Sequence, residues 1–230
     1  MAWFWIPEWR IEPGRTSRQA VVGYPALNLV VEGTRVSLSG ATTRASYRDL
    51  TGSGWAVGAL LRPAAAAALS SAPAALIDAE ETVEAPDLAE AVAREMCSGE
   101  GHRERATAVF SEWLMRRVGP VGVGGRQAND VVDVLLGDAA ADSVDEAATR
   151  LAVSVRTLQR LAHRHVGMSP AAMIRRRRLQ EAAERLRLEP ALDLARLAAE
   201  SGYADHAHLT RDFRQVLGIA PRAYRADAAE

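Results

Sequence analysis

The chain has 230 residues, of which 48% are hydrophobic, and its formal net charge is −1. This length allows one or two domains with hydrophobic cores. The single cysteine, Cys97, excludes an intrachain disulfide framework and a multi-cysteine metal site, and we expect it to be a small buried residue.

The charge is unevenly distributed along the chain. Residues 1–142 carry a net charge of −5 and residues 143–230 a net charge of +4, and all 28 basic residues are arginine. An acidic first part joined to a basic second part is typical of a regulatory domain attached to a nucleic-acid-binding domain. The sequence has no signal peptide and no apolar run of membrane-spanning length, so we expect a cytoplasmic protein that does not bind membranes.

The first third of the chain predicts β structure. Residues 26–31 form a β-branched apolar run, residues 35–40 alternate between polar and apolar, and residues 55–61 follow the turn signal at 52–54. Short strands with glycine-rich turns indicate a small antiparallel sheet or a partial barrel.

The middle of the chain predicts helices at 64–69, 87–96 and 103–118. In the third of these, Phe110, Trp113 and Leu114 share one stripe, which could pack on the sheet or form a dimer interface. Residues 119–125 contain four glycines and a proline. We therefore expect a sensor or dimerisation domain at 1–118, a linker at 119–128 and a DNA-binding domain at 129–230, giving an α+β protein whose last domain is all helical.

The last domain predicts seven helices, at about 129–136, 143–150, 154–165, 170–188, 193–200, 205–217 and 221–226. Capping residues mark several of their starts. Ser143 with Glu146 forms a capping box, and Ser154, Ser169 and Asp205 precede later helices.

The same unit occurs twice in this domain, at residues 144–160 and 194–211. Each copy has a short helix with a central alanine, Ala148 or Ala198, then a tight turn, then a second helix pinned inward by Leu158 or Leu209. A small residue allows two helices to cross closely, and Gly202 can adopt a positive φ in the turn. This pattern predicts two helix-turn-helix units whose second helices have free polar faces.

A polar helix face of this size fits the DNA major groove, where arginine can bond to guanine through two hydrogen bonds. The residues that we expect to contact DNA are Arg156, Thr157, Gln159 and Arg160 in the first unit, and His206, Ala207, His208, Thr210 and Arg211 in the second. Arg164 and Arg214 lie on the same faces. Four consecutive arginines at 175–178 point in different directions on a helix, so at most one or two of them, such as Arg175, are expected at phosphates.

Residues 154–160, 167–170, 202–205, 209–214 and 218–225 together closely resemble the AraC/XylS family of bacterial regulators. The resemblance implies two helix-turn-helix units joined by a rigid helix and inserted in successive major-groove turns. It also implies that Arg156, Gln159, Arg160, His206, Ala207 and Arg211 approach bases. The His206-Ala207-His208 sequence departs from long amides at these positions, which suggests looser reading of the second half-site.

The N-terminal segments around Trp3, Trp5, Trp9, Pro25 and 54–58 resemble the sensor region of a subset of that family. Trp3, Trp5 and Trp55 could line a pocket for a small-molecule effector or could pack in the core. We therefore expect a transcription regulator, monomeric or homodimeric, with double-stranded DNA and RNA polymerase as partners and without a cofactor. The alternatives are an enzyme with an appended DNA-binding module, such as a repair protein, and a ligand-independent dimeric architectural DNA binder.

Overall fold

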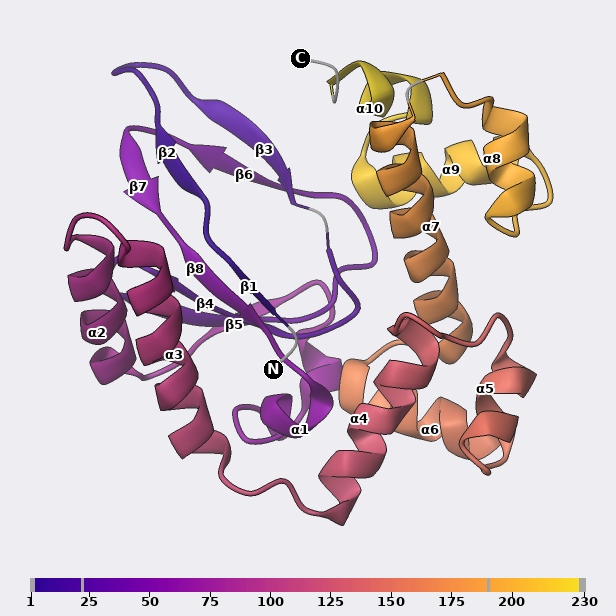
Figure 1. Ribbon diagram of the computed structural model, residues 1–230, viewed down its shortest axis with the longest axis horizontal. Helices are drawn as coiled ribbons and strands as arrows, with labels where there is room; N and C mark the ends of the chain where they lie inside the picture. Colours follow the sequence, from indigo (N-terminus) through magenta and orange to yellow (C-terminus); the bar gives the residue numbers. More distant parts are fainter. Residues whose placement is uncertain (1–2, 22, 190, 228–230) are drawn as a thin grey trace.

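The computed structural model describes residues 3–21, 23–189 and 191–227, and it confirms the predicted α+β architecture. An N-terminal β-rich part with helices is followed by an all-helical part (Figure 1). In Figure 1 the first helix-turn-helix unit lies at the lower right and the second at the upper right, with helix α7 (Pro170–Leu188) running between them.

The central sheet has five antiparallel strands in the order β1-β8-β4-β5-β9. Their bounds are Trp3–Trp5, Val57–Leu60, Asn28–Glu32, Arg35–Ser39 and Glu80–Thr82. The predicted strands correspond to β4, β5 and β8, whereas β1 and β9 at the edges were not predicted. Each of these edge strands has only three residues, too few for an alternating pattern to stand out.

Two further antiparallel ribbons rise from this sheet. One pairs β2 (Glu8–Arg10) with β7 (Ser53–Trp55), and the other pairs β3 (Ser17–Val21) with β6 (Ser46–Leu50). The first ribbon continues the β1–β8 pair beyond Pro7, whose carbonyl accepts a hydrogen bond from Ala56 N–H. Because proline has no N–H to donate, the ladder is interrupted there.

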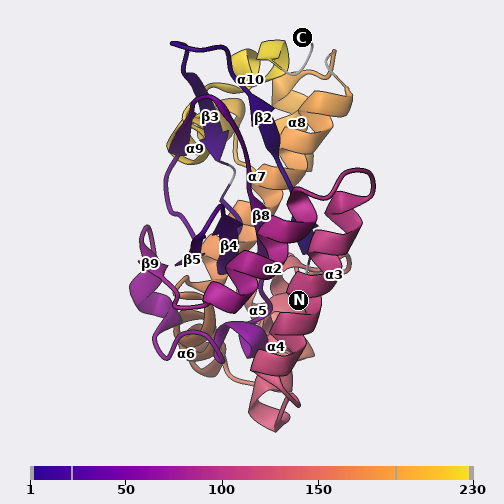
Figure 2. The ribbon, with the colours of Figure 1, turned by 90° about the vertical axis from the view of Figure 1, so that its left-hand side faces the viewer.

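Helices α2 (Pro86–Met96) and α3 (His102–Val118) cover one face of the sheet, and both lie in front of it in Figure 2. Phe110 and Leu114 of α3 are buried in the same core as Leu29 and Leu38 of the sheet. Trp113 packs against that core as well, and its Nε1 donates to Asp87 of α2 at 2.8 Å. The stripe on α3 therefore packs within the domain, which is the first of the two alternatives that the sequence left open.

Two local predictions in this part are wrong. Cys97 is exposed, because α2 ends at Met96 and the cysteine falls at its C-cap rather than on its buried face. Helix α1 is limited to Pro63–Ala66, shorter than predicted. Residues 67–69 continue only as turns.

The predicted linker at 119–128 is wrong in its second half, because α4 (Val123–Leu136) begins inside it. Gly124 and Gly125 are helical despite their low helix propensity. At Gly125 the reason is close packing on α1, since a β-carbon there would lie 3.1 Å from the Ala64 β-carbon. Only Gly119–Gly122 separates α3 from α4.

The remaining helices are α5 (Val144–Arg150), α6 (Val155–Val166), α7 (Pro170–Leu188), α8 (Leu194–Glu200), α9 (His206–Leu217) and α10 (Pro221–Asp227). Apart from α4, which starts earlier, each predicted helix of this part is confirmed to within a residue or two. The caps explain this accuracy, because Ser143, Ser154, Ser169 and Asp205 each accept the expected hydrogen bond from a backbone N–H.

The N-terminal domain packs directly on the helical domain. Ala41 and Ile77 belong to the hydrophobic cluster of the first helix-turn-helix unit. Ala45 N–H donates to Gln215 O in the second unit at 2.9 Å. Arg176 of α7, with 4% of its surface exposed, donates to Gly23 O at 3.1 Å and also to Thr42 O. One short stretch of the N-terminal domain, residues 41–45, thus contacts both units and the helix between them.

Candidate DNA-binding surface

The two helix-turn-helix units have the same local geometry. In the first, Val153 N–H donates to Ala148 O at 3.0 Å, and in the second Tyr203 N–H donates to Ala198 O at 2.9 Å. Ala148 and Ala198 are both buried, as the crossing of two helices requires. The turn of each unit is closed by a residue of positive φ, Ala152 at 52° and Gly202 at 72°.

The second helix of each unit is held from inside and capped at its start. Leu158 of α6 and Leu209 of α9 are completely buried. Ser154 Oγ accepts from Thr157 N–H at 3.1 Å, and Asp205 Oδ1 accepts from His208 N–H at 2.7 Å. The predicted inward residues and caps are confirmed, so one face of each helix is fixed against the protein and the other is free.

The outer face of α6 carries most of the predicted contact residues. Arg156, Gln159 and Arg160 are exposed, as are His163 and Arg164 on the next turn. Thr157 is half-buried, and its hydroxyl accepts a hydrogen bond from Ser154 Oγ at 3.0 Å. Thr157 therefore serves the helix cap in this structure, whereas the other residues point to solvent.

The outer face of α9 is smaller than predicted. His206, Ala207 and Arg211 are exposed together with Arg214, while His208 and Thr210 are half-buried. The His208 ring packs edge-on against Tyr203, with 5.2 Å between ring centroids. His208 thus lies toward the protein, which leaves His206 as the histidine at the outer tip of α9.

The arginines of the second helices differ from those of the first helices in their partners. Arg150 of α5 pairs with Glu146, and Arg196 of α8 pairs with Glu200 at 2.7 Å. The exposed arginines of the second helices make no ion pair with any described residue: Arg156, Arg160 and Arg164 on α6, and Arg211 and Arg214 on α9. Both faces that could enter DNA grooves thus carry positive charge without an ion-pair partner among the described residues. The same is true of exposed arginines elsewhere, among them Arg10, Arg44, Arg94, Arg117 and Arg222.

The four arginines at 175–178 each have a protein partner. Arg175 lies 3.6 Å from Asp212 of α9, and Arg176 holds the N-terminal domain. Arg177 pairs with Glu181 at 3.0 Å and also donates to Ala141 O at 3.1 Å. Arg178 donates to Asp142 O and Gly202 O. Arg175 is half exposed, so of this run it retains the most surface for a phosphate.

Asp212 and Tyr203 are site residues that the sequence did not reveal. Asp212 is a buried carboxylate on α9, and the Tyr203 hydroxyl is buried without a hydrogen-bond partner among the described residues. Burial and the nearby Asp212 charge raise the pKa of Tyr203. Tyr203 lies within the repeat at 194–211 and Asp212 directly after it, but the repeat assigned a role to neither residue.

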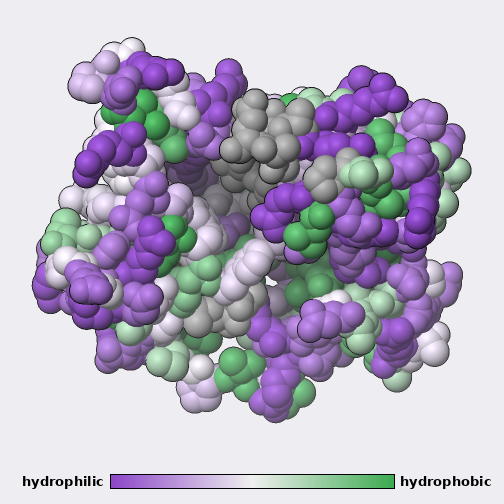
Figure 3. All heavy atoms as spheres, turned by 45° about the horizontal axis from the view of Figure 1, so that its top comes forward, coloured by the Kyte–Doolittle hydropathy of each residue, from purple (hydrophilic) through white to green (hydrophobic). Residues whose placement is uncertain are grey.

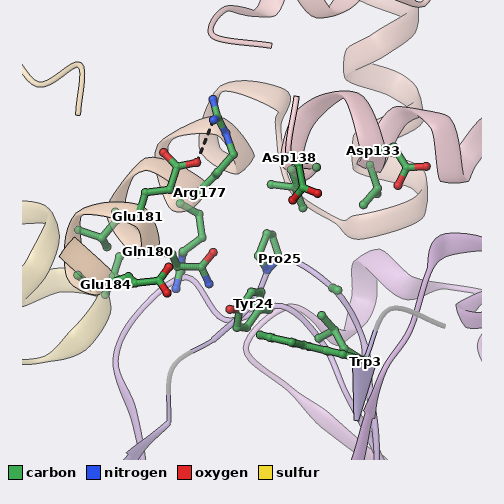
Figure 4. Close-up of a pocket in the computed structure, with 18 of the residues that line it drawn as sticks. Trp3, Tyr24, Pro25, Asp133, Asp138, Arg177, Gln180, Glu181 and Glu184 are labelled. Atoms are coloured by element: carbon green, nitrogen blue, oxygen red, sulfur yellow. Dashed lines mark hydrogen bonds and ion pairs between the residues drawn. The ribbon is translucent and has the colours of Figure 1, made fainter. Parts of the chain in front are cut away.

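A cleft of about 980 Å³ lies between the N-terminal domain and α7 (Figure 4). Trp3, Tyr24 and Pro25 form one wall, and Gln180, Glu181 and Glu184 project from α7 on the other. The Trp3 and Tyr24 rings meet edge-on with their centroids 4.7 Å apart, and burial raises the pKa of Tyr24.

The two other tryptophans of the predicted effector site do not line this cleft. Trp5 donates to Asn28 at 3.2 Å, and Trp55 packs against the core of the N-terminal domain. Of the three predicted residues, the structure places only Trp3 in the cleft wall.

The described residues contain no group of three or more histidine, cysteine, aspartate or glutamate side chains that could hold a metal ion. None of the described helices is both long and apolar enough to cross a membrane. The face shown in Figure 3 is mostly hydrophilic, with hydrophobic side chains only in small separate patches.

Two family comparisons match separate parts of the chain. Residues 147–227 match a helix-turn-helix domain family, and residues 1–82 match a domain of unknown function, DUF6597. The first match contains α6 and α9, the second helices of the two units, and the second match contains the whole five-stranded sheet.

The relatives in sequence are transcription regulators. The chain is 36% identical over 87 residues to the transcriptional activator RhaS of Escherichia fergusonii, covering 38% of this chain and 31% of that protein. It is 33% identical over 124 residues to a putative AraC-like transcription regulator of Streptomyces antibioticus, covering 54% of this chain and 39% of that protein. The chain thus spans about a third of the length of the curated relatives it matches.

The architecture of the whole chain is similar to that of ToxT from Vibrio cholerae. One ToxT structure superposes with a TM-score of 0.52 over 97% of both chains at 11% identity. A second, bound to an unsaturated fatty acid, gives a TM-score of 0.53 over 96% of this chain and 94% of ToxT, also at 11% identity. At this identity the likeness establishes the shared fold.

Proposed function

We propose, from the premise that the C-terminal domain belongs to the AraC-type helix-turn-helix family, that this protein is a transcription regulator that reads a specific DNA sequence with α6 and α9. One observation carries the proposal. The exposed arginines of both second helices have no partner among the described residues, whereas Arg150 and Arg196 on the first helices are paired. Free guanidinium groups on a groove-sized helix suit guanine edges and phosphates.

The experiment is a binding titration of the full chain with duplexes from the region upstream of its own gene. We expect specific complexes whose affinity falls linearly on a logarithmic scale as salt rises, because bound arginines release counterions from phosphates. Binding that is absent for every duplex, or insensitive to salt, would contradict the proposal. A random duplex of equal length is the control for sequence specificity.

We also propose that a small-molecule effector binds in the cleft between the N-terminal domain and α7. An occupant there would contact Trp3 on one side and Gln180 on the other, so binding could alter how the N-terminal domain holds the DNA-binding domain. The test is a thermal-shift screen of a metabolite library with the full chain and with Trp3→Ala. We expect an effector of this cleft to stabilise the wild type more than Trp3→Ala. A compound that stabilises both proteins equally binds outside the cleft.

RNA polymerase is the expected protein partner of such a regulator, and both a monomer and a homodimer are compatible with this function. An enzyme with an appended DNA-binding domain is the second candidate, and its nucleophile would be Cys97, which is exposed at the end of α2. Alkylation of Cys97 separates the two. DNA binding that is unaffected by alkylation supports the regulator, whereas transfer of an alkyl group from damaged DNA to Cys97 would support the enzyme.

A further inference from the structure

The hydrophobic packing of the helical domain is divided in two along α7. Met173 and Ile174 belong to the core of the first helix-turn-helix unit, and Leu179 begins the core of the second. The four arginines at 175–178 occupy the single turn between these cores. Within the helical domain, the relative placement of the units therefore depends on α7 itself and on polar contacts made from this turn. The N-terminal domain adds contacts to both units through residues 41–45 and Ile77.

Arg178 is the arginine of this turn whose hydrogen bonds join the two units. Its Nη2 donates to Asp142 O at 2.8 Å, next to the N-cap of α5, and its Nη1 lies 3.4 Å from Gly202 O in the turn before α9. The Arg175 contact goes to α9, in the second unit, and the Arg177 contacts go to residues 141–142 and to Glu181 on its own helix.

The site around Arg178 is shaped for a flat guanidinium group. A β-carbon at Gly202 would lie 2.8 Å from Arg178 Nη1 and 2.9 Å from its Cζ, so a larger residue would displace the side chain. The bridge crosses a groove of about 240 Å³ between the units, which Asp142, Ser143, Gly202 and His208 help to line. A planar group with several fixed donors can join two carbonyls, whereas a lysine ammonium on a flexible stem holds them less rigidly.

We infer that Arg178 is a positioning residue that fixes the separation and rotation of α6 relative to α9, and so sets the half-site spacing that the protein accepts. The inference rests on the proposed function. Reading helices in consecutive groove turns must match the duplex repeat, because each inserted base pair rotates one half-site by about a tenth of a turn. A rigid protein loses DNA contacts when the half-site spacing does not match its two helices. A more flexible protein can adjust to the changed spacing and keep those contacts.

The test uses the full chain and a binding site selected by the wild type from a randomised duplex library. The probes are this site, versions with one or two base pairs inserted or deleted between its halves, and a duplex with a single half-site. For the wild type we expect affinity to fall roughly tenfold or more for each change in spacing, the equivalent of one lost base contact. For Arg178→Lys we expect a fall of less than about threefold, with unchanged affinity for the single half-site.

Arg185→Lys is the matched control, because Arg185 lies on the same helix but pairs with Glu200 inside the second unit, at 2.6 Å. It should keep the wild-type dependence on spacing. Arg178→Ala should behave as Arg178→Lys does. If Arg178→Ala fails to fold, the spacing dependence of Arg178→Lys is sufficient for the test.

Two results would overturn the inference while leaving the proposed function intact. The first is an Arg178→Lys variant with the wild-type dependence on spacing, and the second is an equal loss on every duplex including the single half-site, which would identify a phosphate contact. A wild type that binds no duplex would refute the proposed function as well.

Discussion

The turns of the two helix-turn-helix units place different residues in the same strained conformation. Ala152 has a φ of 52° where the second unit has Gly202 at 72°. A non-glycine residue in this region costs about 1–2 kcal/mol, because its β-carbon crowds the backbone. The sequence repeat predicted a positive φ at Gly202. It gave no reason to expect one at Ala152, because alanine normally avoids this conformation.

We predict that Ala152→Gly raises the free energy of unfolding by up to about 1 kcal/mol, since relief of strain exceeds the added flexibility of the unfolded chain. Urea denaturation of the wild type and the variant measures this change in the free energy of unfolding. The reverse change, Gly202→Ala, is the matched counterpart and should destabilise, both from its φ and from its contact with Arg178. A destabilised Ala152→Gly variant would show that the alanine side chain contributes more than its backbone costs.

Arg160 is the arginine at the middle of the exposed face of α6, without an ion pair among the described residues. We predict that Arg160→Ala weakens binding to the selected site by about 1–3 kcal/mol and relaxes the preference at one base pair. Competition titrations against single-base variants of the site measure both effects. Arg116→Ala on α3, where the arginine pairs with Glu112, is the control. An equal loss on random DNA would make Arg160 a phosphate contact.

Helices were easier to predict than strands, for a physical reason that individual elements show. The starts of α6 and α9 are determined by Ser154 and Asp205, whose caps depend only on neighbouring residues. Strand β1 has no such local signal, because its place is set by pairing with β8, more than fifty residues away in sequence. The same holds for β9, which pairs with β5 through only three residues.

At the level of elements, the start of α9 depends on a charged cap. Hydrogen bonding from His208 N–H, and less strongly from Ala207 N–H, lowers the pKa of Asp205. A carboxyl whose pKa is lowered by folding stabilises the helix above its ordinary value of about 3.9, and this stabilisation is lost as the pH falls through the lower folded value. Protonation of Asp205 therefore loosens the first turn of α9.

We predict that Asp205→Asn removes this acid dependence while keeping the cap, because the amide oxygen still accepts the bond. The measurement is hydrogen exchange of the His208 amide across the acidic range, corrected for the intrinsic rate. Amides at the start of α6, capped by the non-titrating Ser154, are the internal control. If His208 exchange in Asp205→Asn keeps the wild-type dependence on pH, Asp205 does not control this turn.

At the scale of the molecule, the sequence predicted two domains but not how they meet. The sequence predicted a linker at 119–128, whereas α4 begins at Val123 and its Asn129 accepts from Ala64 N–H at 3.0 Å. Arg176 could not be assigned to the interface from sequence, because nothing in a run of four arginines indicates which of them contacts the N-terminal domain. Only the fold brings it to Gly23 and Thr42, more than 130 residues away.

Arg176 holds the N-terminal domain on α7 through a buried guanidinium group, and burial lowers the pKa of this arginine. We predict that Arg176→Met loosens the interface, because the Gly23 and Thr42 carbonyls each lose a donor. A lost hydrogen bond to a buried carbonyl costs about 1–3 kcal/mol, and Gly23 O keeps a long contact with Gln180 Nε2 at 3.5 Å. The reporter is the Ala45 amide, which donates across the interface to Gln215. Its hydrogen exchange should accelerate by roughly tenfold or more.

Arg35→Met is the control for this change, because Arg35 pairs with Glu80 inside the N-terminal domain. In that variant the Ala45 amide should keep its wild-type exchange rate. A uniform acceleration in Arg176→Met that included Leu29, at the centre of the sheet, would instead mean that Arg176 supports global stability. Selective opening at Ala45 would show that the N-terminal domain can separate from α9 without unfolding, which is the movement that an effector in the adjoining cleft would have to control.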